Sequence, residues 1–255
     1  MGLIYSEEYQ VPFYECDVNH NIKLSILLSI ALQISGRQSL SLGVSDALIF
    51  EKYGLVWIVT DYDISIERLP CYNEKITIAT EAVAYNKLFC YRNFYITGED
   101  GQNIMTIHST FILMDFKTRK VHPVLDEIVA PYQSQKEKRK QKSIKLSDVE
   151  KGKMAEIPVQ VYDLDMNRHV NNGKYLEWFF DSLGLEFLSC YLPERIQLKY
   201  IKEIYYGSNV QTYVNVEKIE DNLISYHDVR GIEGTHARSK MIWRKKENNV
   251  TTQNL

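Results

Sequence analysis

The sequence predicts an α+β fold of two tandem units, each with a long helix and antiparallel strands. Apolar residues recur at helical spacing from residue 24 and again from residue 175, and after each helix the apolar period changes to two. A polar, basic stretch separates these two parts of the chain. The second part also repeats the first in register, which indicates that one unit is present twice.

The first unit opens with a strand, a polar turn and a helix. Tyr9, Val11 and Phe13 alternate as strand residues do, and the polar turn Asp17-Val-Asn follows them. Apolar residues at spacings of three and one then predict an amphipathic helix. These residues are Leu24, Leu27, Leu28, Ala31 and Leu32.

Between residues 55 and 116 the apolar period of two predicts a meander of antiparallel strands. The alternating residues fall into four runs, 62–66, 76–78, 88–96 and 105–113. Turn residues separate the runs at 70–74 and 98–103, and the second of these turns predicts a hairpin connection.

The run from Gln133 to Lys142 is polar and basic without one apolar residue, which predicts a solvated linker or an exposed helix. We therefore predict three parts: an N-terminal unit over 1–132, a basic linker over 133–153 and a C-terminal unit over 154–255. In the last part Ile157, Val159 and Val161 resemble a strand, and further strands are predicted near 196–200, 210–216, 223–229 and 236–243.

An internal repeat relates the two units. Asp17 and Asn19 have counterparts 148 positions later in Asp165 and Asn167. The segment 64–76 aligns without a gap with 198–210, 134 positions later. Matches of this extent indicate duplication of one supersecondary unit.

The two copies differ at groups able to titrate. Asn21 stands where the second copy has His169, and Leu69 stands where it has Glu203. We therefore expect one active site, in the C-terminal unit.

Asp165, Asn167 and His169 occupy every second position, and an extended chain would turn all three side chains to one face. Helically spaced apolar residues follow at once and predict a helix with one buried face. They are Tyr175, Trp178, Phe179 and Leu183. Polar groups at the start of a buried helix predict a functional site.

The run Asp165-x-Asn-x-His-Val-Asn-Asn-x-x-Tyr175 resembles the acyl-ACP thioesterase family, and 198–203 resembles its second catalytic segment. The resemblance extends from Tyr9 to about Arg244. It implies a double hotdog, in which the N-terminal hotdog binds the acyl chain and the C-terminal one is catalytic. It also implies a substrate, fatty acyl-ACP with its phosphopantetheine thioester, a role in fatty acid biosynthesis, and a catalytic set of Asp165, Asn167, His169 and Glu203.

Many plant members of that family carry Cys directly after this Glu, whereas this chain has Ile204. Hydrolysis by activated water is therefore expected, which needs a base and donors for the oxyanion. We expect Glu203 to be the base, His169 to share the water or protonate the thiolate, and Asp165 to orient the imidazole. Asn167 would hold the carbonyl oxygen or the water. The sequence leaves open whether Glu203 or His169 is the base.

The resemblance places the acyl chain in the N-terminal hotdog, so the candidate lining residues are Leu24, Leu28, Ala31 and Trp57. Core packing is the alternative role for each of them, because apolar helix stripes usually form core. Asn171 and Asn172 are candidates for binding the carbonyl at the helix start, with helix capping as the alternative.

Composition excludes several classes of function. A net charge of -3 gives no support for nucleic-acid binding, and the four cysteines are scattered without a close pair. No basic-then-apolar leader and no apolar run of about 20 residues is present, so we expect a cytoplasmic protein without membrane insertion. No metal-ligand cluster, phosphate-binding glycine loop or Gly-x-Ser-x-Gly motif appears, so no metal or cofactor is expected.

Several alternatives stay open. An acyl-CoA thioesterase or a hotdog hydratase or dehydratase are the enzyme alternatives, and an acyl-thioester-sensing module is the non-enzyme one. The basic runs at 136–145 and 238–246 suit an acidic carrier protein, although a solvated surface also explains them. Chain-length preference, and whether the protein is a monomer or a homodimer, are not decided by the sequence.

Overall fold

The computed structural model describes residues 2–138, 141 and 144–246. The strands of the N-terminal half are β1 (Ile4–Gln10), β2 (Leu55–Ile66), β3 (Lys75–Tyr85), β4 (Cys90–Thr97) and β5 (Asn103–Asp115), with short β6 (Val121–His122) and β7 (Gln135–Lys136). Those of the C-terminal half are β8 (Lys153–Pro158), β9 (Tyr191–Tyr200), β10 (Asn209–Ile219), β11 (Asn222–Gly231) and β12 (Gly234–Lys245).

The helices are α1 (Leu24–Ser41), α2 (Asp46–Tyr53), α3 (Asp126–Val129), α4 (Asn172–Leu183) and α5 (Leu185–Cys190). Three short 3-10 turns are η1 (Phe13–Glu15), η2 (Ala130–Tyr132) and η3 (Val161–Asp163). The two long helices and the strands predicted from apolar periodicity are therefore confirmed. The sequence reasoning missed α2, α3 and α5.

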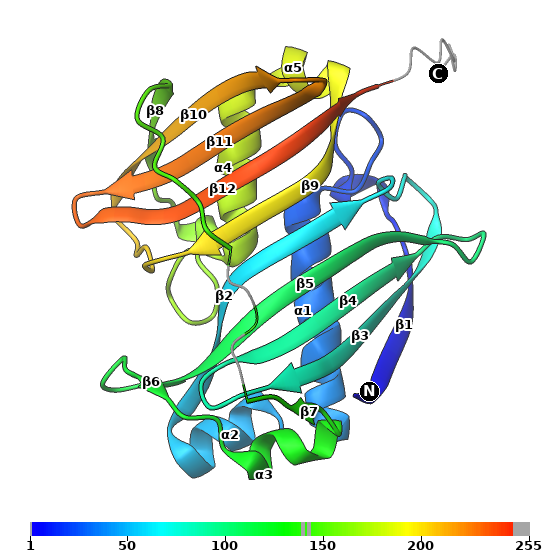
Figure 1. Cartoon of the computed structure of the whole chain (residues 1–255), viewed down its shortest axis with the longest axis vertical. Coiled ribbons are helices and arrows are strands. Elements are labelled where there is room, and N and C mark those ends of the chain that lie inside the picture. Colours follow the sequence, from blue (N-terminus) through cyan, green and yellow to red (C-terminus); the bar gives the residue numbers. More distant parts are fainter. Residues whose placement is uncertain (1, 139–140, 142–143, 247–255) are drawn as a thin grey trace.

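One sheet runs through both halves in the order β1-β3-β4-β5-β2-β9-β12-β11-β10-β8 (Figure 1). The order of the first five strands is repeated, in reverse, by the last five. The halves meet where β2 pairs antiparallel with β9, and there Asp63 faces Gln197. These two residues are 134 positions apart, which is the spacing of the sequence repeat, so this pair lies on the pseudo-twofold axis between the halves.

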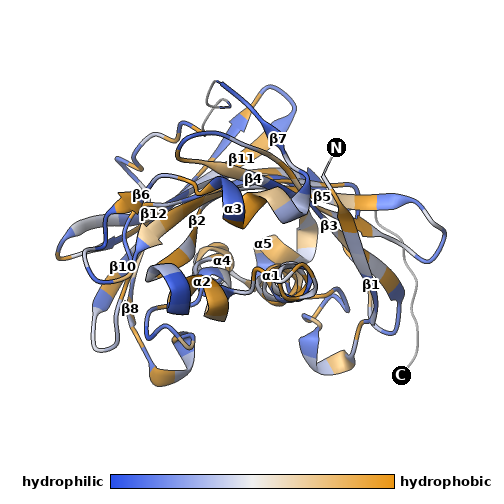
Figure 2. Ribbon diagram, turned by 90° about the horizontal axis from the view of Figure 1, so that it is seen from below, coloured by the Kyte–Doolittle hydropathy of each residue, from blue (hydrophilic) through white to orange (hydrophobic). Residues whose placement is uncertain are grey.

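The helices α1 and α4 lie side by side on the concave face of the curved sheet (Figure 2). They meet at Ser25 and Gly173, which are 148 positions apart, and a Cβ atom at Gly173 would lie 2.6 Å from the Ser25 carbonyl oxygen. Only glycine allows the two backbones to approach this closely. The duplicated helices thus also cross on the pseudo-twofold axis.

Apolar residues of both halves join in one continuous core between helices and sheet. Leu27 of α1 and Phe179 of α4 are fully buried against inward-facing strand residues such as Ile64 and Ile196. This arrangement confirms the double hotdog, a long helix wrapped by an antiparallel sheet, present twice.

Two repeat-equivalent pairs of residues were expected in strands but lie outside them. Val11 and Val159 directly follow the last residues of β1 and β8, and both are buried. Phe13 begins η1 and Val161 begins η3, and both of these side chains are exposed. Their apolar character continued the alternation of the preceding strand in the sequence. In both halves the chain instead bends into a 3-10 turn before the polar loop.

The segment predicted as a solvated linker or exposed helix is mostly exposed where the structure describes it, but there it begins with a strand and has no helix. Its start, β7, pairs in parallel with β3 at Ala84 and Tyr85. Residues 144–152 contain no helix. The boundaries at 132/133 and 153/154 stay predictions.

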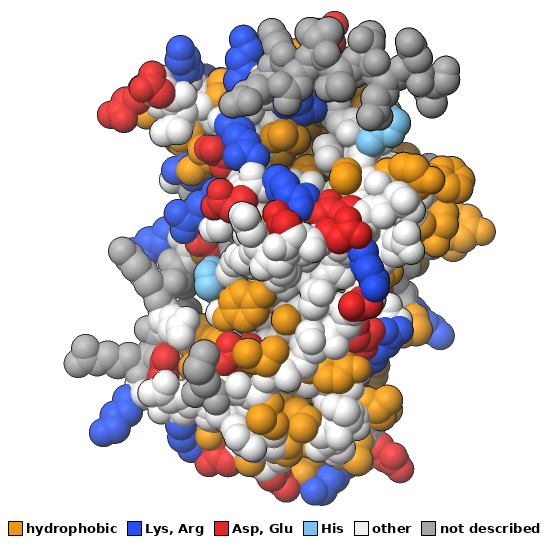
Figure 3. All heavy atoms as spheres, turned by 90° about the vertical axis from the view of Figure 1, so that its right-hand side faces the viewer, with side chains coloured by type: hydrophobic (Ala, Val, Ile, Leu, Met, Phe, Trp, Pro, Cys, Tyr) orange, Lys and Arg blue, Asp and Glu red, His pale blue; other side chains and the backbone are white. Residues whose placement is uncertain are grey.

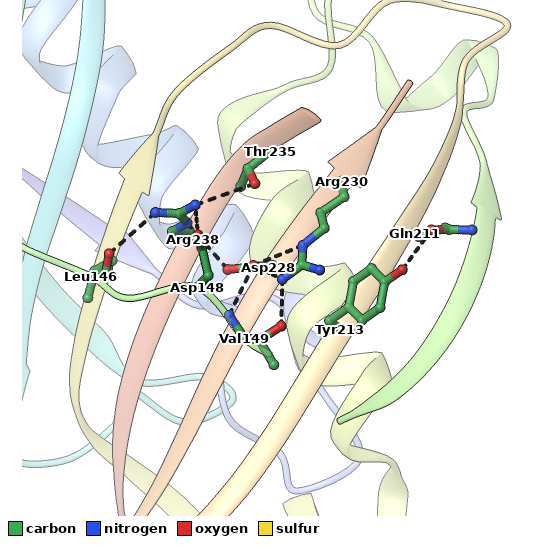
Figure 4. A network of polar contacts seen from close by, with 9 residues as sticks. All are labelled: Leu146, Asp148, Val149, Gln211, Tyr213, Asp228, Arg230, Thr235 and Arg238. Atoms are coloured by element: carbon green, nitrogen blue, oxygen red, sulfur yellow. Dashed lines mark hydrogen bonds and ion pairs between the residues drawn. The ribbon is translucent and has the colours of Figure 1, made fainter. Parts of the chain in front are cut away.

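The later part of this segment lies on the outer face of the C-terminal sheet (Figure 4). The buried Asp228 of β11 accepts a hydrogen bond from the Val149 N–H at 3.2 Å and pairs with Arg230, whose guanidinium also donates to the Val149 carbonyl at 2.5 Å. On β12, Arg238 pairs with Asp148 and donates to the Leu146 carbonyl at 3.4 Å. Charged side chains thus fix the connection across β12 and β11 before it enters β8.

On the side of the molecule drawn in Figure 3, acidic and basic side chains are interspersed with apolar ones. In the N-terminal half, ion pairs join β1 to its neighbours, with Glu7 bound to Arg37 and Glu8 to Lys75. Exposed pairs of this kind contribute little to stability. This side therefore gives no large surface of one charge sign for a partner.

Candidate active site

The polar motif forms a tight turn and not the extended strand that was expected. The Arg168 N–H donates to the Asp165 carbonyl at 3.0 Å and the Asp165 N–H donates to the His169 carbonyl at 2.9 Å. Arg168 has a φ of 68°. The Asp165 carboxylate accepts from the Asn167 backbone N–H at 2.8 Å, so it stabilises the turn in which it lies.

The turn brings Asp165 and His169 together by a route other than strand alternation. His169 Nδ1 lies 3.6 Å from Asp165 Oδ1. Asn167 is exposed, and its side-chain amide lies 3.4 Å from the other oxygen of Asp165. The carboxylate is therefore close enough to orient the imidazole, and the exposed Asn167 contacts the same carboxylate.

The equivalent loop of the first half has the same geometry, with Asn21 at the position of His169. Asp17 Oδ1 accepts from the Asn19 N–H at 2.8 Å, and the Asp17 N–H donates to the Asn21 carbonyl at 2.8 Å. Asn21 forms a bridge with Cys71, as His169 does with Tyr205. The turn is thus a structural feature of both halves, and the histidine was added to, or kept in, only one of them.

Glu203 lies in the loop after β9 and not on a strand. Its Oε1 lies 3.4 Å from His169 Nε2, so the imidazole stands between two carboxylates, Asp165 and Glu203. The Glu203 carbonyl lies 3.1 Å from His236 Nδ1, a contact that ties this loop to β12. All three side chains are partly buried, at 27%, 17% and 26% exposure for Asp165, His169 and Glu203.

Two further groups contact the Glu203 carboxylate, and the sequence reasoning identified neither. The Tyr205 hydroxyl donates to Oε2 at 2.8 Å. Arg119 of the N-terminal half forms an ion pair with Oε1. Arg119 lies in the turn between β5 and β6, where nothing in the sequence marks it as part of a site 84 positions away.

A single cavity of about 630 Å³ connects these groups with the interior of the N-terminal half. At one end it is lined by Asp165, Asn167, His169 and Glu203, together with Arg119, Tyr175 and Tyr205. It then passes apolar side chains that include Leu32 and Trp57, and Phe111, whose ring packs edge-on against Trp57. We call the apolar-walled part of this cavity the slot.

The residues predicted to line the slot divide into two groups. Trp57 lies in its wall. Leu24, Leu28 and Ala31 are almost fully buried in the main core and are not among the lining residues. Leu24, Leu28 and Ala31 pack instead against the other helix and the sheet. The residues of α1 that border the slot begin at Leu32, one position after Ala31.

Asn171 and Asn172 occupy the start of α4. The Asn171 side chain accepts from the Gly173 N–H at 2.8 Å, so Asn171 is the N-cap, the alternative that was left open. Asn172 lines the cavity, and its carbonyl accepts from the Tyr200 hydroxyl at 2.7 Å. Its backbone N–H donates to no other group in the described part of the chain.

No group of three or more His, Cys, Asp or Glu side chains suited to holding a metal ion occurs among residues 2–138, 141 and 144–246. None of the helices in the described part of the chain is long and apolar enough to cross a membrane.

Two family models match the chain. The acyl-ACP thioesterase N-terminal domain matches residues 2–132, and the acyl-ACP thioesterase C-terminal domain matches residues 146–245. The chain belongs to the acyl-ACP thioesterase family. This confirms the family that the motif at 165–175 indicated.

Two curated relatives of this family member are plant enzymes. The chloroplastic oleoyl-acyl carrier protein thioesterase of Coriandrum sativum is 24% identical, with 88% of this chain and 66% of that protein covered. The chloroplastic palmitoyl-acyl carrier protein thioesterase of Gossypium hirsutum is 23% identical, with 96% and 65% covered. The chain thus spans slightly less than two thirds of the length of these relatives.

Solved structures of the family share the fold over nearly the whole chain. A Lactobacillus plantarum protein named as an oleoyl thioesterase is 32% identical with a TM-score of 0.91, over 96% of this chain and 98% of that one. The 12:0-ACP thioesterase from Umbellularia californica is 20% identical with a TM-score of 0.83, over 95% and 94%. The second likeness concerns the fold alone.

Proposed function

We propose that this acyl-ACP thioesterase family member hydrolyses fatty acyl-ACP to free fatty acid and holo-ACP in fatty acid biosynthesis. The observation that carries the proposal is the placement of Asp165, His169 and Glu203 at one end of an apolar-walled cavity. A thioester at the polar end would leave its alkyl chain in the slot. The cytoplasmic location expected from the sequence stays a prediction.

Hydrolysis would proceed by attack of water, with Glu203 as the base. A water molecule between Glu203 Oε1 and His169 Nε2, which are 3.4 Å apart, would contact both groups with small adjustments. Glu203 takes one proton while the water oxygen bonds to the thioester carbon. When the carbon–sulfur bond breaks, the proton held by Glu203 passes through His169 to the thiolate, so Glu203 is restored and the products are a carboxylic acid and a thiol.

The protein also offers a donor for the oxyanion. The Asn172 N–H has no other partner in the described chain and lies in the first turn of α4, where the helix dipole favours negative charge. Because Asn172 lines the cavity, we assign the developing oxyanion to this N–H.

A cysteine nucleophile at the family's usual position is not part of this proposal. The residue after Glu203 is Ile204, which is buried in the main core and carries no thiol. Activated water fits the groups that remain.

The test is release of free thiol from acyl-ACP and acyl-CoA of several chain lengths, with the fatty acid identified by mass spectrometry. We expect thiol and fatty acid in equal amounts and a higher kcat/KM on the ACP series. Higher kcat/KM on acyl-CoA would move the assignment to an acyl-CoA thioesterase. Interconversion of 3-hydroxyacyl and enoyl thioesters without thiol release, or binding without turnover, would contradict hydrolysis.

A further inference from the structure

The part of the cavity that lies in the N-terminal half has a polar section in its wall. Its wall there includes Arg92 of β4, Asp46 at the start of α2, Ser39 of α1 and Tyr132 of η2. A slot for a plain hydrocarbon chain would be expected to be lined by apolar side chains, because burial of charged groups without partners is costly. The composition of this section therefore carries information about the ligand.

Arg92 is a buried cation on the inward face of its strand. Arg92 is at an alternate position with Cys90, Phe94 and Ile96, so its side chain lies on the same face of β4 as theirs, and only 8% of it is exposed. Its Nη1 donates to Gln38 Oε1 at 2.6 Å and to Thr80 Oγ1 at 2.9 Å. Both partners are neutral, and burial lowers the pKa of Arg92.

The remaining N–H groups of Arg92 are not used by the protein. Its Nε and Nη2 donate to no group in the described part of the chain, and no carboxylate of that part lies within 4.0 Å of it. The guanidinium also lies over the Tyr132 ring, 5.1 Å from its centre, and the Tyr132 hydroxyl donates to Ser39 at 2.6 Å. Arg92 is thus held rigidly by Gln38, Thr80 and Tyr132, with donors left for a ligand.

Asp46 borders the same section of the cavity. Burial raises the pKa of its carboxyl, and the charge of Arg92 acts in the opposite direction. Asp46 is nevertheless exposed, so solvent also reaches its carboxyl where it borders the cavity. Asp46 and Arg92 therefore influence each other electrostatically without forming an ion pair.

We propose that this section of the cavity is a binding subsite for an acyl chain that carries a hydroxyl group toward its distal end. A hydroxyl can accept from an N–H group of Arg92 that the protein leaves unused, and its own O–H can still donate to another acceptor or to water. A methyl terminus would displace water from Arg92 and return no hydrogen bond. A terminal carboxylate would pair with Arg92 but would be repelled by Asp46. The inference rests on the proposed thioesterase activity.

The test compares kcat/KM for ω-hydroxyacyl-ACP and unsubstituted acyl-ACP over a series of even chain lengths. At the lengths that reach Arg92, we expect the hydroxylated chain to be preferred about ten- to hundredfold, as hydrogen bonds to charged groups allow. Arg92→Met should abolish this preference.

Arg37→Met is the matched control, because Arg37 is the α1 neighbour of Gln38 but pairs with Glu7 at the surface. It should keep the preference. A second measurement does not depend on any variant: free ω-hydroxydodecanoate should raise the Tm of the wild-type protein more than dodecanoate does.

Equal or higher kcat/KM on unsubstituted chains at every length, or a preference for ω-carboxyacyl chains, would overturn the subsite. Absence of thiol release from every acyl thioester would contradict the proposed function. In that case the Tm comparison would still decide the subsite, with equal shifts overturning it.

Discussion

Arg119 and Glu203 form an ion pair that joins the two halves of the molecule at the candidate active site. Arg119 comes from the turn between β5 and β6 and Glu203 from the loop after β9. The same carboxylate oxygen faces His169 Nε2 at 3.4 Å. The N-terminal half therefore supplies both the slot and a charge that fixes the proposed base.

We predict that Arg119→Gln lowers kcat about tenfold and changes KM by less than about twofold, because a looser carboxylate spends less time aligned with His169. Arg119→Lys should recover part of the loss. Steady-state kinetics on acyl-ACP is the measurement, and Lys120→Gln in the same turn is the control. Unchanged turnover in Arg119→Gln would show that the ion pair does not position Glu203 for the reaction, and faster turnover would show that it opposes the action of Glu203 as a base.

Glu203→Gln should lower kcat by about a hundred- to ten-thousandfold, the usual contribution of a general base. The amide can still accept from the Tyr205 hydroxyl, so the loop should keep its position. The matched control is Glu177→Gln on α4, a carboxylate paired with Lys174 and outside the cavity wall. Wild-type turnover in Glu203→Gln would exclude Glu203 as the base.

His169→Asn should lose turnover to a similar degree while the fold is kept. The first half already has Asn21 at this place in the same turn, so the backbone accepts asparagine there. The reciprocal change, Asn21→His, should leave kcat unaltered because Leu69 offers no carboxylate nearby. Thermal melts within a few degrees of wild type would confirm folding, whereas normal activity in His169→Asn would contradict the assignment.

The internal repeat made the fold predictable. The apolar periodicity indicates the same helix and strands in both halves, and matching residues of the two halves are 148 or 134 positions apart. Asp63 and Gln197, and Ser25 and Gly173, show that these spacings are also the symmetry of the structure. Short helices such as α2 and α5 were missed, since eight residues or fewer hold too few apolar positions to show a period. Phe13 and Val161 were assigned to strands because alternation alone does not reveal where pairing ends.

The candidate site was predictable only where its residues share one motif. Asp165, His169 and Glu203 were found by comparing the two copies, although a turn and not a strand brings the first two together. Arg119 joins them through tertiary structure, which no local pattern reports. Arg92 did leave a signal: it occupies an inward position of the predicted strand between Cys90 and Phe94, where a charge is out of place.

The crossing of α1 and α4 gives a stability prediction. Gly173→Ala would place a Cβ atom 2.6 Å from the Ser25 carbonyl oxygen, and separating the helices should cost about 1–3 kcal/mol. Gly36→Ala is the matched change in α1, where a Cβ would meet nothing within 4 Å. That change should stabilise the fold by about 0.5–1 kcal/mol, since alanine is the better helix former. Urea unfolding measures both, and equal effects would contradict a close crossing.

His227 gives a prediction for acid stability. It is fully buried between Ser225, which lies 2.8 Å from its Nε2, and the Phe179 ring, and burial lowers its pKa from 6.5 to about 3. Between these pH values the unfolded chain binds a proton that the folded protein does not, so acid favours unfolding. This contribution is absent above about pH 6.5 and grows by about 1.4 kcal/mol per pH unit below it.

His227→Gln removes the titrating group and keeps a side chain that can bond to Ser225. Lowering the pH from about 7.5 to about 5 should therefore destabilise the wild-type protein by about 2 kcal/mol more than the variant. Urea midpoints for both proteins at several pH values measure this difference. The two proteins have the same carboxylates, so the effects of these groups on stability cancel in the comparison. Parallel pH profiles would show that His227 binds its proton equally well in the folded and unfolded protein. Its Nδ1 has no hydrogen-bond partner in the described chain. That outcome would therefore mean that water or a nearby oxygen reaches Nδ1.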